Sequence, residues 1–289
     1  KTPVQFHTSM PKRRPFEALP MIGEAWQFFW KQPALLPVSV LMLGLSNFFI
    51  STMSRLVEPE GALQNSTLAT FLQTNDPNNF SIGLAGFLLF LLTLWGIAGV
   101  LVVGRRMIGT RSGRARTSFL SVTHEALPFV RPMFFTCILV AAEILLWSVP
   151  GIVCLFILML SGAIDVWSNE QFFAMLILSL PTAYAAFRLS FTTLAIVCEE
   201  PLAYRAALRR SKALIAGKFW TVVWCTLIFT AGLLVPVTLL SVGTESLAND
   251  PWLLIGADFL AQMIGGMLTA IFLLTNVILY GKLRDAPRQ

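Results

Sequence analysis

Charged residues are scarce in this sequence, and histidine and cysteine are scarcer still. Of its 289 residues, 12% are charged and 56% are hydrophobic, whereas a soluble domain carries about 25% charged residues. So few polar side chains cannot cover, in water, the core that a chain of this length would form. The composition therefore excludes a soluble globular protein, a disordered chain and a disulfide-rich secreted module, and it predicts an integral membrane protein.

The rare residues also limit the chemistry that the chain can carry. With only His7 and His124, a histidine-based metal site or a Ser-His-Asp triad has little to draw on. The four cysteines lie in or beside apolar runs without a CxxC pair, which is typical of packing residues. There is no Walker-type glycine loop, dinucleotide fingerprint, HExxH or GxSxG motif. We therefore expect no enzymatic activity and no cofactor.

Long apolar runs dominate the rest of the sequence. A helix needs about 20 apolar residues to cross a bilayer. Six stretches are long enough: Ala34–Ser54, Phe80–Gly104, Pro132–Ser161, Phe172–Ser190 (or on to Cys198), Phe219–Val242 and Trp252–Gly281. Backbone groups in lipid must be satisfied within the segment, so we predict six transmembrane helices. Pro150, Pro181 and Pro236 mark the expected kinks in the third, fourth and fifth helices.

Positive charge falls on one side of these spans. Apart from Arg55, every lysine and arginine lies in the N-terminal arm, the second and fourth loops, the inner end of the fourth span or the tail. The alternate loops carry acidic residues instead: Glu58, Glu60, Asp76, Asp165, Glu170, Glu245 and Asp250. This asymmetry predicts that both termini are cytoplasmic. The net charge of +6 therefore reflects orientation, and we expect anionic phospholipid, not nucleic acid, as a partner.

A short amphipathic segment precedes each odd-numbered span. These segments are Met21–Lys31, Thr117–Val130 and Pro201–Gly217. We therefore predict an all-α polytopic fold of three hairpins, each preceded by a short interfacial helix. Residues 1–20 are expected to form a cytoplasmic arm without a signal peptide, residues 21–281 a single transmembrane domain, and residues 282–289 a cytoplasmic tail.

A more specific pattern spans residues 188–220. Arg188 lies late in the fourth span, Glu199 follows, and Ala207-Leu208-Arg209-Arg210-Ser211 precedes Gly217-Lys218-Phe219-Trp220. This pattern resembles a bacterial family of six-helix inner-membrane proteins, which includes stand-alone members of unknown function and the membrane domain attached to some glycerophosphodiester phosphodiesterases. The resemblance implies a bacterial inner-membrane location. It implies no activity, because the six predicted spans leave no room in this sequence for the catalytic barrel of those phosphodiesterases, which needs about 250 residues.

Ionisable residues inside the spans are candidates for function, because charge in lipid is costly. Glu143 lies near the middle of the third span and Arg188 in the inner half of the fourth, so the two could form an ion pair. Such a pair could set the hairpin register or form a polar site, or Arg188 could snorkel beside a protonated Glu143. Asp258, one turn from Gln262 in the sixth span, could face the outer interface or line a polar groove.

These observations favour a non-enzymatic accessory or scaffold protein that associates with lipids and with other membrane proteins. Its candidate lipid-headgroup residues are Arg205, Arg209, Lys212 and Lys218. The alternative is a transporter or permease subunit with a polar site around Glu143, Arg188 and Asp258. An intramembrane lipid enzyme is the least favoured class, because clustered His, Asp and Ser residues are lacking.

Overall fold

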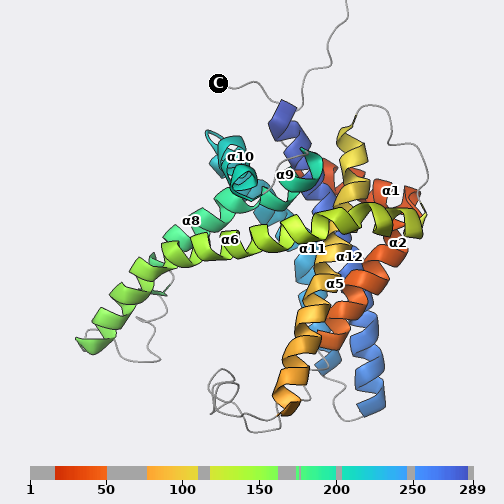
Figure 1. Ribbon diagram of the computed structural model, residues 1–289, viewed down its shortest axis with the longest axis horizontal. Helices are drawn as coiled ribbons and strands as arrows, with labels where there is room; N and C mark the ends of the chain where they lie inside the picture. The colour runs from red at the N-terminus through yellow and green to blue at the C-terminus, as the bar shows by residue number, and fades with distance from the viewer. Residues whose placement is uncertain are drawn as a thin grey trace, which may run out of the picture.

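A computed structural model (Figure 1) describes residues 17–50, 77–109, 118–161, 174–175, 177–199, 204–245 and 251–285. Every regular element within these ranges is a helix, so the predicted all-α class is confirmed. Five helices in this part of the chain are long and apolar enough to cross a membrane, and a bent pair near the N-terminus would make a sixth. The helices are therefore consistent with the predicted multi-pass membrane protein.

Several predicted features lie outside the described residues. They are the N-terminal arm up to residue 16, the loop at 51–76 with Arg55 and three of the acidic residues, residues 110–117, the loop at 162–173, the first residues of the third interfacial segment, Asp250 and the last four residues of the tail. The expected division of charge between the two sides of the membrane is therefore described only in part.

A bundle of helices surrounds α12 (Pro251–Asp285), which packs against the N-terminal helices, α5 (Pro77–Ile108) and α11 (Phe219–Glu245). The first span begins with α2 (Leu35–Pro37) and the π-helix η1 (Val38–Gly44) and stays helical to residue 50. The C-terminal half of α12 supplies much of the core. Its fully buried side chains there include Ile271, Leu274, Val277 and Tyr280.

Glycines allow α12 and η1 to approach closely. A Cβ atom added to Gly266 would lie 2.5 Å from the backbone oxygen of Ser39 and 2.6 Å from the nitrogen of Gly44. A Cβ atom added to Gly44 would lie 3.0 Å from the backbone oxygen of Gln262. No larger side chain fits between these backbones, which is the close helix packing that small residues permit between membrane helices.

The predicted first amphipathic helix is α1 (Ala18–Lys31), which begins three residues earlier than expected. It buries Met21, Ala25 and Phe29, four residues apart along one face. Trp26 and Trp30 stay exposed on another face. The chain then turns by 105° into the helical segment Leu35–Ile50.

The second hairpin differs from the prediction. A break near Arg131-Pro132 was expected to separate an interfacial helix from the third span, but α6 (Phe119–Leu160) is one helix that continues through Pro128, Pro132 and Pro150. Each proline removes one backbone hydrogen bond, a loss that a long membrane helix tolerates. Pro181 lies in the first turn of α8 (Leu180–Leu189) and does not kink the middle of a span.

Figure 1 shows α6 and α8 running side by side away from the bundle. In the most apolar stretch of α6, no residue is buried within the chain. The hairpin returns to the bundle through α9 (Thr192–Cys198), which packs against both α5 and α6. The outer part of this hairpin thus exposes its apolar side chains to the surroundings of the protein.

The bundle has a basic end, where α5 closes with Arg105 and Arg106 and α12 closes with Lys282 and Arg284 (Figure 1). The third predicted amphipathic helix, α10 (Arg205–Ile215), packs against α9 near this end. One face of this helix buries the side chains of Ala207, Leu208, Leu214 and Ile215, while Tyr204, which precedes the helix and shares that face by spacing, is exposed.

Candidate functional site

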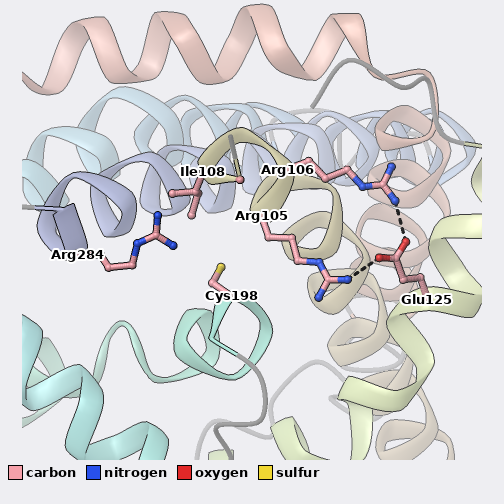
Figure 2. A pocket seen from close by; sticks show the side chains of 7 residues that line it. Arg105, Arg106, Ile108, Glu125, Cys198 and Arg284 are labelled. Atoms are coloured by element: carbon pink, nitrogen blue, oxygen red, sulfur yellow. Dashed lines mark hydrogen bonds and ion pairs between the residues drawn. The ribbon is translucent and has the colours of Figure 1, made fainter. Parts of the chain in front are cut away.

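Three arginines from two helices line a pocket of about 570 Å³ at the basic end (Figure 2). Arg105 and Arg106 lie in the last turn of α5, and Arg284 lies in the last turn of α12. Basic side chains are favoured at these positions because the helix dipole places partial negative charge at a C-terminus. The other lining residues are Ile108, Gly109, Glu125 and Cys198. We call this hollow the arginine pocket.

Glu125 of α6 holds both arginines of α5. Its Oε1 accepts a hydrogen bond from Arg105 Nη2 at 2.6 Å, and its Oε2 accepts one from Arg106 Nη2 at 2.8 Å. Arg105 Nη1 also donates to the backbone oxygen of Val197 at 3.4 Å, and its guanidinium carbon lies 5.5 Å from the ring centroid of Phe129. These contacts fix two neighbouring guanidinium groups against one carboxylate.

Arg284 approaches the arginine pocket from the other helix. Figure 2 shows its guanidinium near the Cys198 thiol, on the far side of the pocket from Glu125. Arg284 Nε donates to Asp285 Oδ1 at 3.0 Å, and that carboxylate is largely exposed to solvent. Among the described residues that line the pocket, three arginines therefore face one carboxylate. This arrangement suits an anion, because guanidinium groups form paired hydrogen bonds with carboxylate and phosphate oxygens.

A second polar cluster lies beside the pocket and is centred on Glu199. Its Oε2 accepts from Arg210 Nε at 2.7 Å, and its Oε1 accepts from Arg210 Nη2 at 2.8 Å and from the Tyr280 hydroxyl at 2.6 Å. Burial raises the pKa of Glu199, but the hydrogen bonds from Arg210 and Tyr280 outweigh it and hold the pKa below its usual value. The hydrogen bond to Glu199 in turn raises the pKa of Arg210. The charged cluster therefore connects α9, α10 and α12.

The structure gives Glu143 a partner other than the one considered from the sequence. Its carboxylate accepts a hydrogen bond from Lys212 of α10 and forms an ion pair with it. The Arg188 guanidinium lies instead over the Tyr184 ring, 5.3 Å from its centroid. The Arg188 backbone oxygen accepts from the Ser211 hydroxyl at 2.8 Å. The difference arises because α10 packs against α6 and brings its own lysine within reach.

Three of the predicted headgroup residues gather around Glu143 between α6 and α10. One hollow of about 500 Å³ is lined by Leu139, Glu143, Arg205, Leu208, Arg209 and Lys212. A second hollow of about 660 Å³ shares Leu139 and Arg205 and is also lined by Arg131, Phe135, Ile138, Tyr204 and Ala206. We call the two hollows together the α6–α10 groove.

The other predicted site residues lie elsewhere. Lys218 lies in the turn between α10 and α11 and does not line the groove. Asp258 is buried in α12, and its Oδ1 accepts a hydrogen bond from Gln262 Nε2 at 3.3 Å. The described contacts therefore do not gather Glu143, Arg188 and Asp258 into the single polar site that the transporter alternative requires.

Sequence reasoning missed the arginine pocket. Arg105, Arg106 and Arg284 entered only the argument on orientation, and Glu125 was assigned no function. A signal was present, because adjacent arginines close one long span and a lone glutamate lies in the amphipathic segment that follows. Which helix ends meet depends on the tertiary structure, however. Among the described residues, no three His, Cys, Asp or Glu side chains are grouped as a metal site would require.

No protein-family model, no curated protein and no solved structure matches this chain. The resemblance of residues 188–220 to the bacterial inner-membrane family therefore stays a prediction.

Proposed function

We propose that this protein is a non-enzymatic accessory or scaffold protein of the bacterial inner membrane, which binds anionic phospholipid on its cytoplasmic side. One observation carries the proposal: the α6–α10 groove combines an apolar wall on α6 with a basic rim to which both helices contribute. An amphiphile with a negative headgroup matches both parts.

The apolar wall is accessible. On α6, the side chains of Phe135 and Ile138 are 45% and 50% exposed, and the Tyr204 ring lies 6.5 Å from the Phe135 ring, centroid to centroid. An acyl chain can lie along this wall, where contact with lipid removes apolar surface from water. The wall lies directly beside Arg131 and Arg205, which line the same hollow.

The basic rim supplies the headgroup contacts. Arg131, Arg205, Arg209 and Lys212 line the groove, and Glu143 is the one carboxylate among its described lining residues. Since Glu143 is already paired with Lys212, the arginines remain to attract an anionic headgroup. Each basic residue near an anionic leaflet contributes about 1 kcal/mol.

The proposed topology is six transmembrane helices in three hairpins, with the basic end on the cytoplasmic side. The bent arrangement of α1 and the first span supports an interfacial first helix. The amphipathic α10 beside the basic end supports the third interfacial helix. In the proposed topology, the first part of α6 takes the place of a separate second interfacial helix. The uncovered apolar surface of the outer part of α6 is the proposed contact for other membrane proteins.

The test compares lipid binding by two variants with equal loss of charge. The groove variant combines Arg205→Gln and Arg209→Gln, and the control combines Lys31→Gln and Lys218→Gln, outside the groove. The full chain is purified in a neutral detergent and titrated with phosphatidylglycerol or phosphatidylcholine, and native mass spectrometry counts the bound lipids. We expect phosphatidylglycerol to bind the groove variant about tenfold more weakly than the wild type and the control nearly as well as the wild type. Equal loss in the two variants, or none in the groove variant, would overturn the proposal.

A further inference from the structure

We propose that the arginine pocket is a second binding site, specific for a phosphate group, which is carried either by a lipid headgroup or by a soluble phosphate compound. This site is separate from the α6–α10 groove, because no residue lines both. Its ligand chemistry also differs. The groove has an extended apolar wall for an acyl chain, whereas Ile108 is the one large aliphatic side chain among the described residues that line the pocket.

The geometry of α5 prepares two guanidinium groups before any ligand arrives. Arg105 and Arg106 are adjacent in the chain, and both donate to Glu125, one to each carboxylate oxygen. Long side chains lose conformational entropy when a ligand immobilises them, and Glu125 has already restricted these two. A guanidinium has five N–H donors. The bond from Arg106 to Glu125 uses its Nη2, so donors on the same group remain for phosphate oxygens.

The Glu199 cluster sets the position of the third arginine. Tyr280 and Arg284 are four residues apart in α12, so they lie on the same face of the helix. The hydrogen bond from Tyr280 to Glu199 turns that face toward the end of α9. Arg284 therefore faces the pocket, near Cys198, the residue before Glu199 (Figure 2). Glu199 and Tyr280 act as positioning residues for this site.

Three arginines that converge from two helices on one hollow distinguish a site from the general excess of positive charge on this side. A charge that only orients the protein in the membrane can lie at any exposed position of the loops and helix ends. Here one acidic residue holds two of the arginines in place, and a hydrogen-bonded cluster orients the third. A phosphate group has more acceptor oxygens than a carboxylate, so it can accept hydrogen bonds from several planar guanidinium forks at once.

The experiment measures binding of inorganic phosphate to the full chain in neutral detergent. Isothermal titration and thermal unfolding are recorded with phosphate and with chloride at equal ionic strength. The variants are Arg284→Gln and Arg106→Gln in the pocket, with Arg209→Gln in the groove as the matched control. A second arm repeats the comparison with nanodiscs of phosphatidic acid or phosphatidylcholine. Helix content by circular dichroism verifies that each variant is folded. If Arg284→Gln does not fold, Arg106→Gln alone provides the test of the pocket.

We expect inorganic phosphate to bind the wild type and Arg209→Gln alike, and to bind either pocket variant at least tenfold more weakly. We expect phosphatidic acid to bind either pocket variant more weakly than it binds the wild type. Binding of inorganic phosphate identifies a soluble compound as the source, and binding of phosphatidic acid alone identifies a lipid. Arg284→Lys is expected to recover only part of the affinity, because an ammonium cannot form the paired contact. If neither ligand binds, or if the pocket variants bind as well as the wild type, the proposal is wrong.

Discussion

The Tyr280 hydroxyl donates a 2.6 Å hydrogen bond to Glu199 and so joins the central helix α12 to the end of α9. The Tyr280 side chain is fully buried, and its ring lies 6.0 Å from that of Phe191. Because Glu199 also accepts two hydrogen bonds from Arg210, one carboxylate connects three helices. Little water competes for these bonds, which strengthens them and raises the cost of breaking any one of them.

Removing the Tyr280 hydroxyl should destabilise the protein while leaving its packing intact. Tyr280→Phe deletes the hydrogen bond to Glu199 and keeps the buried ring, so we expect a loss of about 1–3 kcal/mol in the free energy of unfolding. Thermal unfolding in detergent measures the change. Tyr184→Phe is the matched control, because that residue is 40% exposed on α8 and should unfold as the wild type does. Equal midpoints for the two variants would contradict the structural role of the hydroxyl.

The same cluster predicts a dependence of stability on pH. The pKa of Glu199 in the folded protein lies below its usual value of 4.5. Its contribution to stability is therefore complete above about pH 4.5 and is lost as the pH falls through the folded pKa. In Glu199→Gln, this contribution is absent at every pH. The difference in unfolding midpoint between the wild type and Glu199→Gln should be constant near neutral pH and shrink in acid. If the difference in unfolding midpoint grew in acid, the predicted direction of the pH dependence would be wrong.

The ion pair between Glu143 and Lys212 should appear as energetic coupling between α6 and α10. A double-mutant cycle with Glu143→Gln and Lys212→Gln is expected to give a coupling energy of at least about 0.5 kcal/mol. The same cycle with Glu143→Gln and Arg188→Gln should give nearly none, because Arg188 lies over Tyr184. Chemical or thermal unfolding of the four proteins in each cycle provides the numbers. If Glu143 were coupled more strongly to Arg188 than to Lys212, the prediction would be wrong, and the Glu143–Arg188 ion pair considered from the sequence would be favoured.

The close approach of α12 and η1 makes Gly266 intolerant of any side chain. Gly266→Ala places a Cβ atom within 2.6 Å of two backbone atoms of η1, so the helices must separate and repack. We expect several degrees of lowered unfolding temperature, with reduced yield of folded protein. Gly256→Ala in the same helix is the control, because a Cβ atom there has nothing within 4 Å. That variant should be neutral or slightly stabilised, since alanine favours a helix more than glycine does.

Features that depend on local sequence could be predicted well. Long apolar runs identify membrane helices because the thickness of the bilayer sets the length of helix required. Four of the five residues that spacing places on one face of α10 are buried, namely Ala207, Leu208, Leu214 and Ile215, because a helix returns to the same side every three to four residues. The fifth, Tyr204, precedes the helix and is exposed. The break expected at Arg131-Pro132 was wrong, because a proline disrupts only one turn, and a helix stabilised over a much longer stretch continues past it.

The candidate site was harder to predict. Arg205, Arg209 and Lys212 were identified because amphipathicity is readable in one helix, and the structure places them together in one groove. Glu143 was identified as an intramembrane charge, but its partner could not be chosen from the sequence. Arg188 and Lys212 both lie within reach of α6 in principle, and only the path of α10 across α6 decides between them.

The sequence by itself determined that this is a helical protein suited to a membrane, where its apolar runs lie and where its positive charges fall along the chain. Those properties follow from the length of apolar runs and from the order of charged residues along the chain. Only the tertiary structure decided that Arg105, Arg106, Glu125 and Arg284 form one pocket. They come from three helices and are up to 179 positions apart by residue number, so their meeting depends on how the helix ends pack, which no local pattern encodes.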